Sequence, residues 1–284
     1  MVTIADAQLV MILFLVIFIM NVIAYFVFIP KKYRLKVTMS EREKNAYSFT
    51  RQILPYLALV SFIYILVKSQ GIIVNVFDIS PDYALAKYIL DIEGNSVSMF
   101  QSFTNPLLTY ASSFIYIFGF SFLLIFTFVV LVFTKQIRAL QEYAIAVAII
   151  YVVAFPFYIF TPVKVTGYTL SNVIPLLYDL SPVIHDGLRT VDPFFDNCFP
   201  SLHAALSVLA MLFIIFRTNL LGFKIVAVLI TLAIQFTIFY LGIHWIIDFV
   251  AGIILAVISF YIATRYHDRI VARFAVLLNR SSRY

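Results

Sequence analysis

Long apolar stretches are the feature of this sequence that most constrains its fold. A helix of about 20 apolar residues crosses the roughly 30 Å hydrocarbon core of a membrane. With 63% hydrophobic and 12% charged residues, the chain is too apolar for a water-soluble domain. The sequence therefore predicts an all-α, multi-pass integral membrane helix bundle. We expect about seven transmembrane helices, over residues 9–29, 53–77, 106–133, 143–160, 202–216, 225–241 and 245–264.

The basic residues divide the connecting segments into two sides. Sixteen of the 20 lysines and arginines fall in residues 31–51, 135–138, 217–224 and 265–284, which share one side if seven helices alternate. Ten of the 14 acids fall on the other side. Because basic loops stay in the cytoplasm, we expect a cell-membrane protein with its N-terminus outside and its C-terminus inside. We also expect the first helix to be retained rather than cleaved as a signal peptide, since no basic residue precedes it.

The net charge of +6 has a simple explanation in this topology. The basic inner face meets anionic lipid, so no nucleic-acid partner is implied.

The outer side has two longer segments. Residues 78–105 have the spacing of a short amphipathic helix along the interface, and residues 161–199 are proline-containing loop with one or two helical turns. The single cysteine, Cys198, excludes an intrachain disulfide, and we expect it to pack rather than react.

A first polar cluster, "DNCFPSLHAAL", stands at the start of the fifth apolar stretch, residues 196–206. Pro200 suits the first position of a helix, because a proline has no N–H to leave unpaired there. Ser201 and His203 then occupy the first turn. The free backbone N–H groups and the positive end of the helix dipole make such a turn an anion site. We expect an anion to bind at this helix start.

A second polar cluster, "LGIHWIIDFVAG", covers residues 241–252. His244 and Asp248 are four residues apart, on one face of the last helix. A carboxylate that accepts a hydrogen bond from one imidazole nitrogen fixes the tautomer and leaves the other nitrogen as a base or nucleophile. Taken alone, the pair is slightly better explained as a polar contact that stabilises the helix. Both clusters begin helices on the outer side, so the two histidines can converge at one depth.

Taken together, "FPSLHAA" and "YLGIHWIIDFVAG" resemble two signature motifs of the type 2 phosphatidic acid phosphatase superfamily. The resemblance covers roughly residues 86–264 and is closest to the inositol phosphorylceramide synthase-like branch. It implies a core of six helices, preceded here by one more, that acts on lipid phosphates without metal or other cofactor. Residues 53–265 would form this membrane domain, after an N-terminal helix and basic loop (1–52) and before a basic tail (266–284).

The resemblance also implies roles for individual residues. His244 would be the nucleophile that takes the phosphoryl group, and Asp248 would orient it. His203 would be the general acid toward the leaving alkoxide, and Ser201 would bind phosphate oxygens. A neutral His244 and a protonated His203 predict a bell-shaped dependence of rate on pH.

The chain lacks the cations that usually accompany these motifs. Thr237 and Ile238 stand where the superfamily commonly has serine and arginine, and the lysine-arginine motif that usually comes first is absent. Two bases on the outer side are candidates to bind phosphate in their place. We favour Lys164, which follows the fourth helix, over Arg189. Arg189 could equally be a solvated or headgroup-facing loop residue, and this alternative is weaker for Lys164.

The predicted function is hydrolysis of a phospholipid or a polyprenyl mono- or diphosphate at the outer face, through a phosphohistidine intermediate. An alternative is a phosphotransferase that moves a phosphorylated headgroup, such as inositol phosphate, between lipids. Two other classes remain open: a non-catalytic transporter with a His/Asp relay, and a metal or haem protein that uses the two histidines as ligands. The expected partners are the bilayer and a lipid phosphate.

Overall fold

The computed structural model describes residues 4–34, 54, 56, 58–63, 65–66, 69–189 and 192–281. This part of the chain contains no β-strand beyond an isolated bridge between Val163 and Asn197, so the predicted all-helical class is confirmed. The long helices are α1 (Ile4–Phe28), α6 (Phe120–Phe133), α7 (Ile137–Phe160), α10 (Leu202–Arg217), α11 (Leu221–Tyr240) and α12 (Ile246–Ser281). The short ones are η1 (Lys31–Tyr33), α3 (Gln70–Val76), α4 (Ala84–Glu93), η2 (Ser96–Gln101), α5 (Pro106–Phe114), the π-helix η3 (Ile115–Gly119), α8 (Thr166–Thr169) and α9 (Pro182–Arg189).

Five helical stretches in the described residues are long and apolar enough to cross a membrane. They are Met11–Phe28, Pro106–Phe133, Ile137–Phe160, Leu221–Tyr240 and Ile246–Arg273. Each overlaps a predicted span, which confirms a multi-pass membrane protein. The predicted span over 202–216 is α10, an apolar helix of 16 residues. The predicted span over 53–77 lies partly outside the described residues; α3 forms its C-terminal part.

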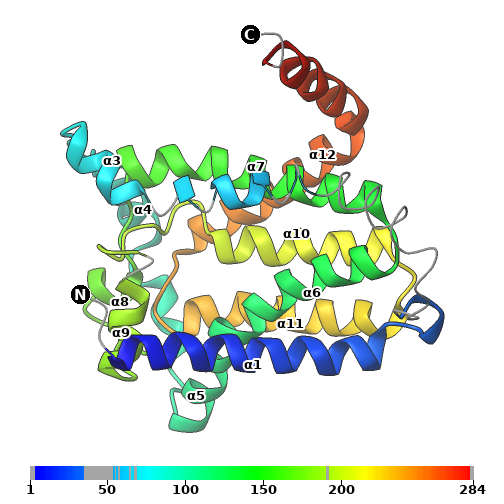
Figure 1. Cartoon of the computed structure of the whole chain (residues 1–284). Coiled ribbons are helices and arrows are strands. Elements are labelled where there is room, and N and C mark those ends of the chain that lie inside the picture. Colours follow the sequence, from blue (N-terminus) through cyan, green and yellow to red (C-terminus); the bar gives the residue numbers. More distant parts are fainter. Residues whose placement is uncertain are drawn as a thin grey trace.

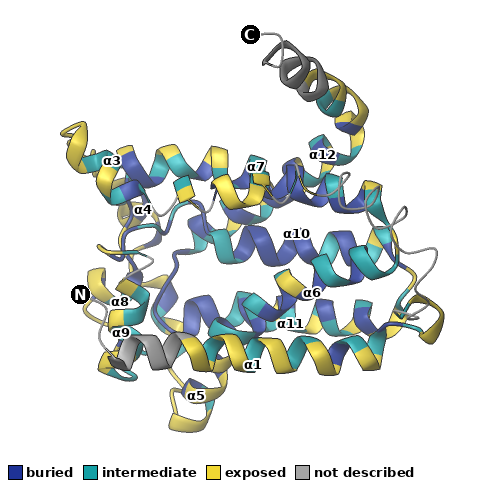
Figure 2. Cartoon of the chain, viewed as in Figure 1, coloured by how far each residue is buried: buried dark blue, intermediate teal, exposed yellow. Residues whose placement is uncertain are grey.

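Helix α10 lies at the centre of the bundle. It packs against α6, α7, α11 and α12, and Figure 2 shows it buried along most of its length, whereas α1 exposes much of its surface. The reason lies in the residues: two alanines and Ser207 in the first half of α10 let neighbouring helices approach closely, as small residues do in membrane bundles. The central helix is therefore held on several sides, and its first turn is a rigid place for a functional group.

The connections of the bundle gather at two opposite ends (Figure 1). One end contains α4, α5, α8 and α9 together with the starts of α10 and α12. The basic turns after α1, α6 and α10 lie at the other end. Within the described residues, the segments that the charge pattern assigned to opposite sides thus lie at opposite ends of the bundle, as expected. Which end faces the cytoplasm remains a prediction.

We call the end that contains the starts of α10 and α12 the site end. The two longer segments at this end have the structures that their patterns predict. Helix α4 lies within the predicted amphipathic stretch, and residues 161–199 contain the short helices α8 and α9. Helix α12 continues without a break past residue 266, where we placed the start of the basic tail. The division of the chain into 1–52, 53–265 and 266–284 remains a prediction.

A buried acid connects three helices at the basic end. The side chain of Glu142, on α7, is 1% exposed. Its carboxylate pairs with Arg138 one turn earlier at 3.0 Å and with Arg217, the last residue of α10, at 2.8 Å. Arg138 also pairs with Asp268 of α12 at 3.2 Å. This cluster holds α7, α10 and α12 together at the basic end of the bundle, opposite the site end.

Candidate active site

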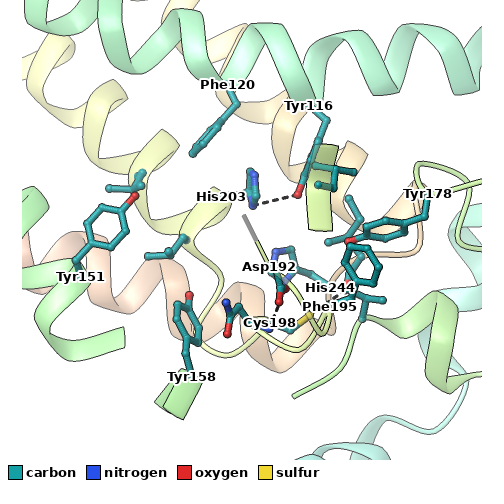
Figure 3. Close-up of a pocket in the computed structure, with 16 residues that line it drawn as sticks. Tyr116, Phe120, Tyr151, Tyr158, Tyr178, Asp192, Phe195, Cys198, His203 and His244 are labelled. Atoms are coloured by element: carbon teal, nitrogen blue, oxygen red, sulfur yellow. Dashed lines mark hydrogen bonds between the residues drawn. The ribbon is translucent and has the colours of Figure 1, made fainter. Parts of the chain in front are cut away.

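The two histidines predicted to converge do lie side by side. His203 is the second residue of α10, and His244 lies in the connection between α11 and α12. Their ring centroids are 5.9 Å apart, with the ring planes inclined by 56°. Both rings line a cavity of about 240 Å³ at the site end of the bundle (Figure 3). Two side chains 41 positions apart in sequence therefore face one small space.

The first turn of α10 is held by its own cap and by a neighbouring helix. The hydroxyl oxygen of Ser201, the N-cap residue, accepts a hydrogen bond from the backbone N–H of Ala204 at 3.2 Å. The hydroxyl of Tyr158 donates to the carbonyl of Pro200 at 2.8 Å. Ser201 is fully buried and is not among the residues that line the cavity. Its observed role is to cap the helix that presents His203.

His244 is oriented by the chain on both sides of it. Gly242, with φ of +72°, turns the chain between the two helices, and a Cβ there would lie 2.5 Å from the carbonyl oxygen of Ile174. Nδ1 of His244 lies 3.4 Å from Oδ2 of Asp248, which also accepts from the backbone N–H of Trp245 at 3.1 Å. A proton on Nδ1, facing the carboxylate, leaves the lone pair on Nε2.

Burial also determines the charge of this imidazole. Removal from water lowers the pKa of His244 below its ordinary value, and a hydrogen bond with the backbone of Cys198 opposes this only in part. Burial therefore favours the neutral form of the ring.

Close packing of α12 on the start of α10 sets the separation of the two histidines. A Cβ added to Gly252 would lie 2.5 Å from the carbonyl oxygen of Ser201 and 3.0 Å from Cβ of Ala204. At the same crossing, the backbone N–H of Ser201 donates to the carbonyl of Asp248 at 3.1 Å. Only glycine fits at this crossing, and the helix that bears Asp248 is bound directly to the cap of the helix that bears His203.

Aromatic side chains enclose His203. The ring of Tyr116 stacks on it with centroids 4.3 Å apart, and the Tyr116 hydroxyl lies 3.5 Å from Nδ1. The ring of Phe120 lies on another side at 4.5 Å (Figure 3). Tyr116 belongs to the π-helix η3, and π-turns are frequent at functional sites because the extra residue changes where side chains point. The imidazole is thereby held in one orientation.

The described residues that line the cavity include no lysine or arginine. Four tyrosines, Asp192 and Asn197 supply most of its polar groups; the tyrosines are Tyr116, Tyr151, Tyr158 and Tyr178. The carboxylate of Asp192 accepts from the backbone N–H groups of Asp196 and Asn197, and burial raises its pKa. The cavity thus offers hydroxyls and one carboxylate but no cationic side chain.

The two bases predicted to bind phosphate lie outside this lining. The side chain of Lys164 is exposed, while its carbonyl accepts from the indole N–H of Trp245 at 2.9 Å. Burial and the neighbouring Asp192 raise the pKa of Asp196 to about 6, and Lys164 opposes that rise. Arg189 ends α9 and is exposed. Of the six predicted site residues, the structure brings together His203, His244 and Asp248, places Ser201 directly behind them, and leaves the two bases at the surface.

Sequence reasoning missed Glu93. This residue ends α4, is 9% exposed, and accepts hydrogen bonds from the backbone N–H groups of Ile246 at 2.8 Å and Ile247. A carboxylate from a distant helix thus caps the helix that begins beside His244. The sequence contained one indication. A glutamate at a helix C-terminus interacts unfavourably with the helix dipole, so a tertiary contact that stabilises its carboxylate is expected.

Gln101 was also missed. Its amide nitrogen donates to the carbonyls of Ile174 at 2.8 Å and Tyr240 at 2.9 Å, and its amide oxygen accepts from the backbone N–H of Ile174 at 2.8 Å. These bonds tie η2 to the loop before α9 and to the end of α11. No sequence signal distinguishes this glutamine, because contacts over more than 70 residues leave no local pattern.

One comparison with known proteins gives a match. The family model described as the PAP2 superfamily matches residues 87–262, more than half of the chain. The matched segment begins in α4 and ends in α12, so it contains both histidines and Asp248. A search of curated proteins and a search of solved structures returned no match.

Proposed function

Since the chain belongs to the type 2 phosphatidic acid phosphatase (PAP2) superfamily, we propose that it hydrolyses a lipid phosphate at the outer face of the cell membrane. The substrate class is a phospholipid or a polyprenyl mono- or diphosphate, and the intermediate is a phosphohistidine. The inositol phosphorylceramide synthase-like branch remains a prediction for this chain.

In this proposal His244 acts as the nucleophile. Nε2 attacks phosphorus and the bond from phosphorus to the lipid oxygen breaks, so that the phosphoryl group is carried on the imidazole. Asp248 stabilises the positive charge that develops on the ring, because its carboxylate faces Nδ1 at 3.4 Å. Water then attacks the phosphohistidine and releases phosphate.

His203 supplies the proton for the departing oxygen. It lies in the first turn of α10, where free backbone N–H groups and the helix dipole stabilise negative charge on phosphate oxygens. This helix start compensates in part for the lack of a basic side chain among the described residues of the cavity lining. Lys164 and Arg189 would act from the surface, where they attract anionic headgroups before entry.

The single observation that supports this function best is the 5.9 Å between the two ring centroids. Reacting atoms must approach to about 3–3.5 Å, and rings at this separation can each reach one phosphoryl group from different sides. A separation of this size also leaves no room for a thick wall of side chains between nucleophile and acid.

One feature of the cavity favours a second candidate, transfer of a phosphorylated headgroup to an alcohol. A phosphate monoester carries close to two negative charges at neutral pH, whereas a diester carries one. The carboxylate of Asp192 repels the monoester more strongly, and the tyrosine hydroxyls suit a polyol headgroup. Both reactions share the first covalent step; they differ in the acceptor, water or alcohol.

The test is turnover by the purified full chain in detergent with excess chelator. We would offer phosphatidic acid, phosphatidylglycerol phosphate, polyprenyl mono- and diphosphates and an inositol-containing phospholipid, and measure phosphate and diacylglycerol release. We expect chelator-resistant turnover of at least one lipid, loss of it in His244→Ala, and strong reduction in His203→Ala. Unchanged turnover in His244→Ala would remove His244 as the nucleophile.

The orientation needs a separate test. Lys164 is exposed at the site end, so an impermeant amine reagent applied to intact cells should label it. Labelling that requires access from the cytoplasm would reverse the proposed topology.

A further inference from the structure

A second group of side chains meets at the back of His244. The sulfur of Cys198, a ring nitrogen of His244 and a carboxylate oxygen of Asp248 all lie within 4.8 Å of one another, and Nδ1 is the ring nitrogen that faces Asp248. All three residues are buried, at 1%, 3% and 0% exposure respectively. The proposed reaction uses the imidazole and the carboxylate, but it does not use the thiol.

The hydrogen bonds of this group are incomplete. Oδ1 of Asp248 is buried and has no hydrogen-bond partner, although the side chain is fully enclosed. The Cys198 sulfur has one weak contact, to the carbonyl of Ile243 at 3.4 Å. A buried carboxylate oxygen without a partner costs free energy, and a cation that the carboxylate binds through both of its oxygens would supply the missing interaction of Oδ1.

We propose that Cys198, His244 and Asp248 form a site for a divalent cation of the zinc class, and that the bound ion inhibits the enzyme. Binding does not depend on the proposed function; the inhibition rests on it. A thiolate, an imidazole and a carboxylate are all ligands that Zn²⁺ takes, and a set that includes sulfur selects against Mg²⁺ and Ca²⁺.

The geometry needs only small movements. Ligand atoms bound to one tetrahedral Zn²⁺ at about 2.0–2.3 Å lie roughly 3.5 Å apart. The imidazole nitrogen and the carboxylate already have that separation, 3.4 Å. The sulfur must approach by at most about 1.3 Å, within reach of a side-chain rotation. A thiolate and a carboxylate would also neutralise the ion, so no net charge would be buried.

The ion has a route to these ligands. Cys198 and His244 both line the cavity drawn in Figure 3, so a cation can approach them through the space that the substrate would occupy. Burial raises the pKa of the Cys198 thiol, and binding therefore releases the thiol proton.

Inhibition follows from the tautomer of His244. In the proposed reaction the proton is on Nδ1, which faces Asp248, and the lone pair is on Nε2. An ion bound at Nδ1 moves the proton to Nε2 and occupies the carboxylate as well. The nitrogen proposed to attack phosphorus then has no lone pair to offer, and the group that oriented it is engaged elsewhere.

Cobalt(II) tests the binding without any substrate. A tetrahedral Co²⁺ site with a thiolate ligand has a sulfur-to-metal charge-transfer band in the near ultraviolet and visible bands of tetrahedral cobalt. We expect both bands in the purified full chain, saturating at a single ion per chain and displaced by Zn²⁺. Absence of the charge-transfer band with the wild-type chain would overturn the proposal.

Variants of Cys198 test the thiolate ligand. Cys198→Ser should abolish the charge-transfer band and weaken Zn²⁺ binding at least about 10-fold, since even outer-shell partners of a metal contribute roughly 10- to 100-fold. Cys198→Ala serves the same purpose if the serine variant does not fold. His203→Ala is the matched control, because His203 shares the cavity but not the cluster, and it should bind cobalt as the wild type does. Loss of binding in His203→Ala would instead place the ion between the two histidines and overturn our assignment.

The inhibition is measured against each protein's own rate without zinc. In the wild type, Zn²⁺ should stop turnover over the concentration range in which it displaces cobalt. In Cys198→Ser, the concentration for half inhibition should rise at least about 10-fold. Equal zinc sensitivity in the two proteins would overturn the inhibitory role. If the chain binds cobalt but turns over no lipid, the metal site is supported and the proposed function is refuted.

Discussion

Substitution of Gly252 by alanine tests the helix crossing that fixes the distance between the two histidines. The added Cβ would lie 2.5 Å from the Ser201 carbonyl oxygen, whereas ordinary contacts begin near 3.4 Å. The two helices must therefore separate by about 0.9 Å locally. Overpacking of this kind costs about 1–3 kcal/mol, and the better helix propensity of alanine returns up to about 1 kcal/mol. Because the obstacle is a rigid backbone carbonyl, the cost should be near the upper end of this range. We therefore expect the free energy of unfolding to fall by about 2 kcal/mol.

The same displacement should affect the reaction more than the stability. A misplacement of about 1 Å can reduce an enzymatic rate about 10²-fold, so turnover in Gly252→Ala should fall by that order. Trp245, the only tryptophan in the chain, is 1% exposed and adjoins His244, so its fluorescence reports on the site without substrate. We expect its emission to shift to longer wavelength, with a lower thermal unfolding midpoint.

Gly222→Ala is the matched control for this experiment. Gly222 also lies in a membrane-spanning helix, but a Cβ there would meet only the ring of Phe28 at 3.6 Å, an ordinary contact. It should leave fluorescence, unfolding and turnover close to those of the wild type. If Gly252→Ala behaves like Gly222→Ala, the close crossing of α10 and α12 does not set the site geometry and our reasoning is refuted.

Three further predictions concern buried acids. Glu93→Gln removes the negative charge that caps the start of α12 and weakens these hydrogen bonds by about 1.5–3 kcal/mol. Because this helix start adjoins His244, kcat should fall about 10-fold or more with little change in KM. Glu142→Gln leaves Arg217 without a charged partner and should lower the free energy of unfolding by about 1–3 kcal/mol, less than for a fully buried pair because the arginine can reach water. Asp196 has a pKa raised to about 6 by burial, so the folded state holds its proton more tightly than the unfolded state; between about pH 4 and 6, rising pH should destabilise the wild type relative to Asp196→Asn.

Each of these predictions has a clear contrary result. For Glu93→Gln, steady-state kinetics that show a change in KM alone would mean that the carboxylate affects binding rather than the position of α12. For Glu142→Gln, wild-type unfolding in denaturant would mean that the cluster at the basic end contributes nothing. For Asp196→Asn, thermal unfolding that differs from the wild type by the same amount at every pH would contradict a perturbed Asp196 carboxyl.

The sequence was informative where a local pattern has a direct physical cause. Apolar length predicted the positions of five membrane-spanning helices, and amphipathic spacing predicted α4. The meeting of His203 and His244 could be predicted because each stands at the start of a helix, and both helices begin on the same side. Asp248 followed from its spacing of four residues after His244.

Other parts of the site depend on contacts that leave no local pattern. Tyr116 lies in an apolar span that looks uniform, and its position against His203 depends on the π-turn of η3. Glu93 reaches the start of α12 across more than 150 residues. We predicted that Lys164 or Arg189 binds phosphate because both lie in loops near the site. Their side chains are exposed, and a sequence does not reveal which loop residue points into a cavity.

The covalent intermediate tests the central claim most directly. The full chain would be mixed with each lipid of the panel, quenched in alkali within a turnover, digested and examined by mass spectrometry, because phosphohistidine is stable in alkali and labile in acid. We predict a phosphoryl group, with or without its headgroup, on the peptide that contains His244, and none in His244→Ala. Turnover of a lipid with the adduct on His203, or with no adduct on His244 at any quench time, would contradict the proposed chemistry.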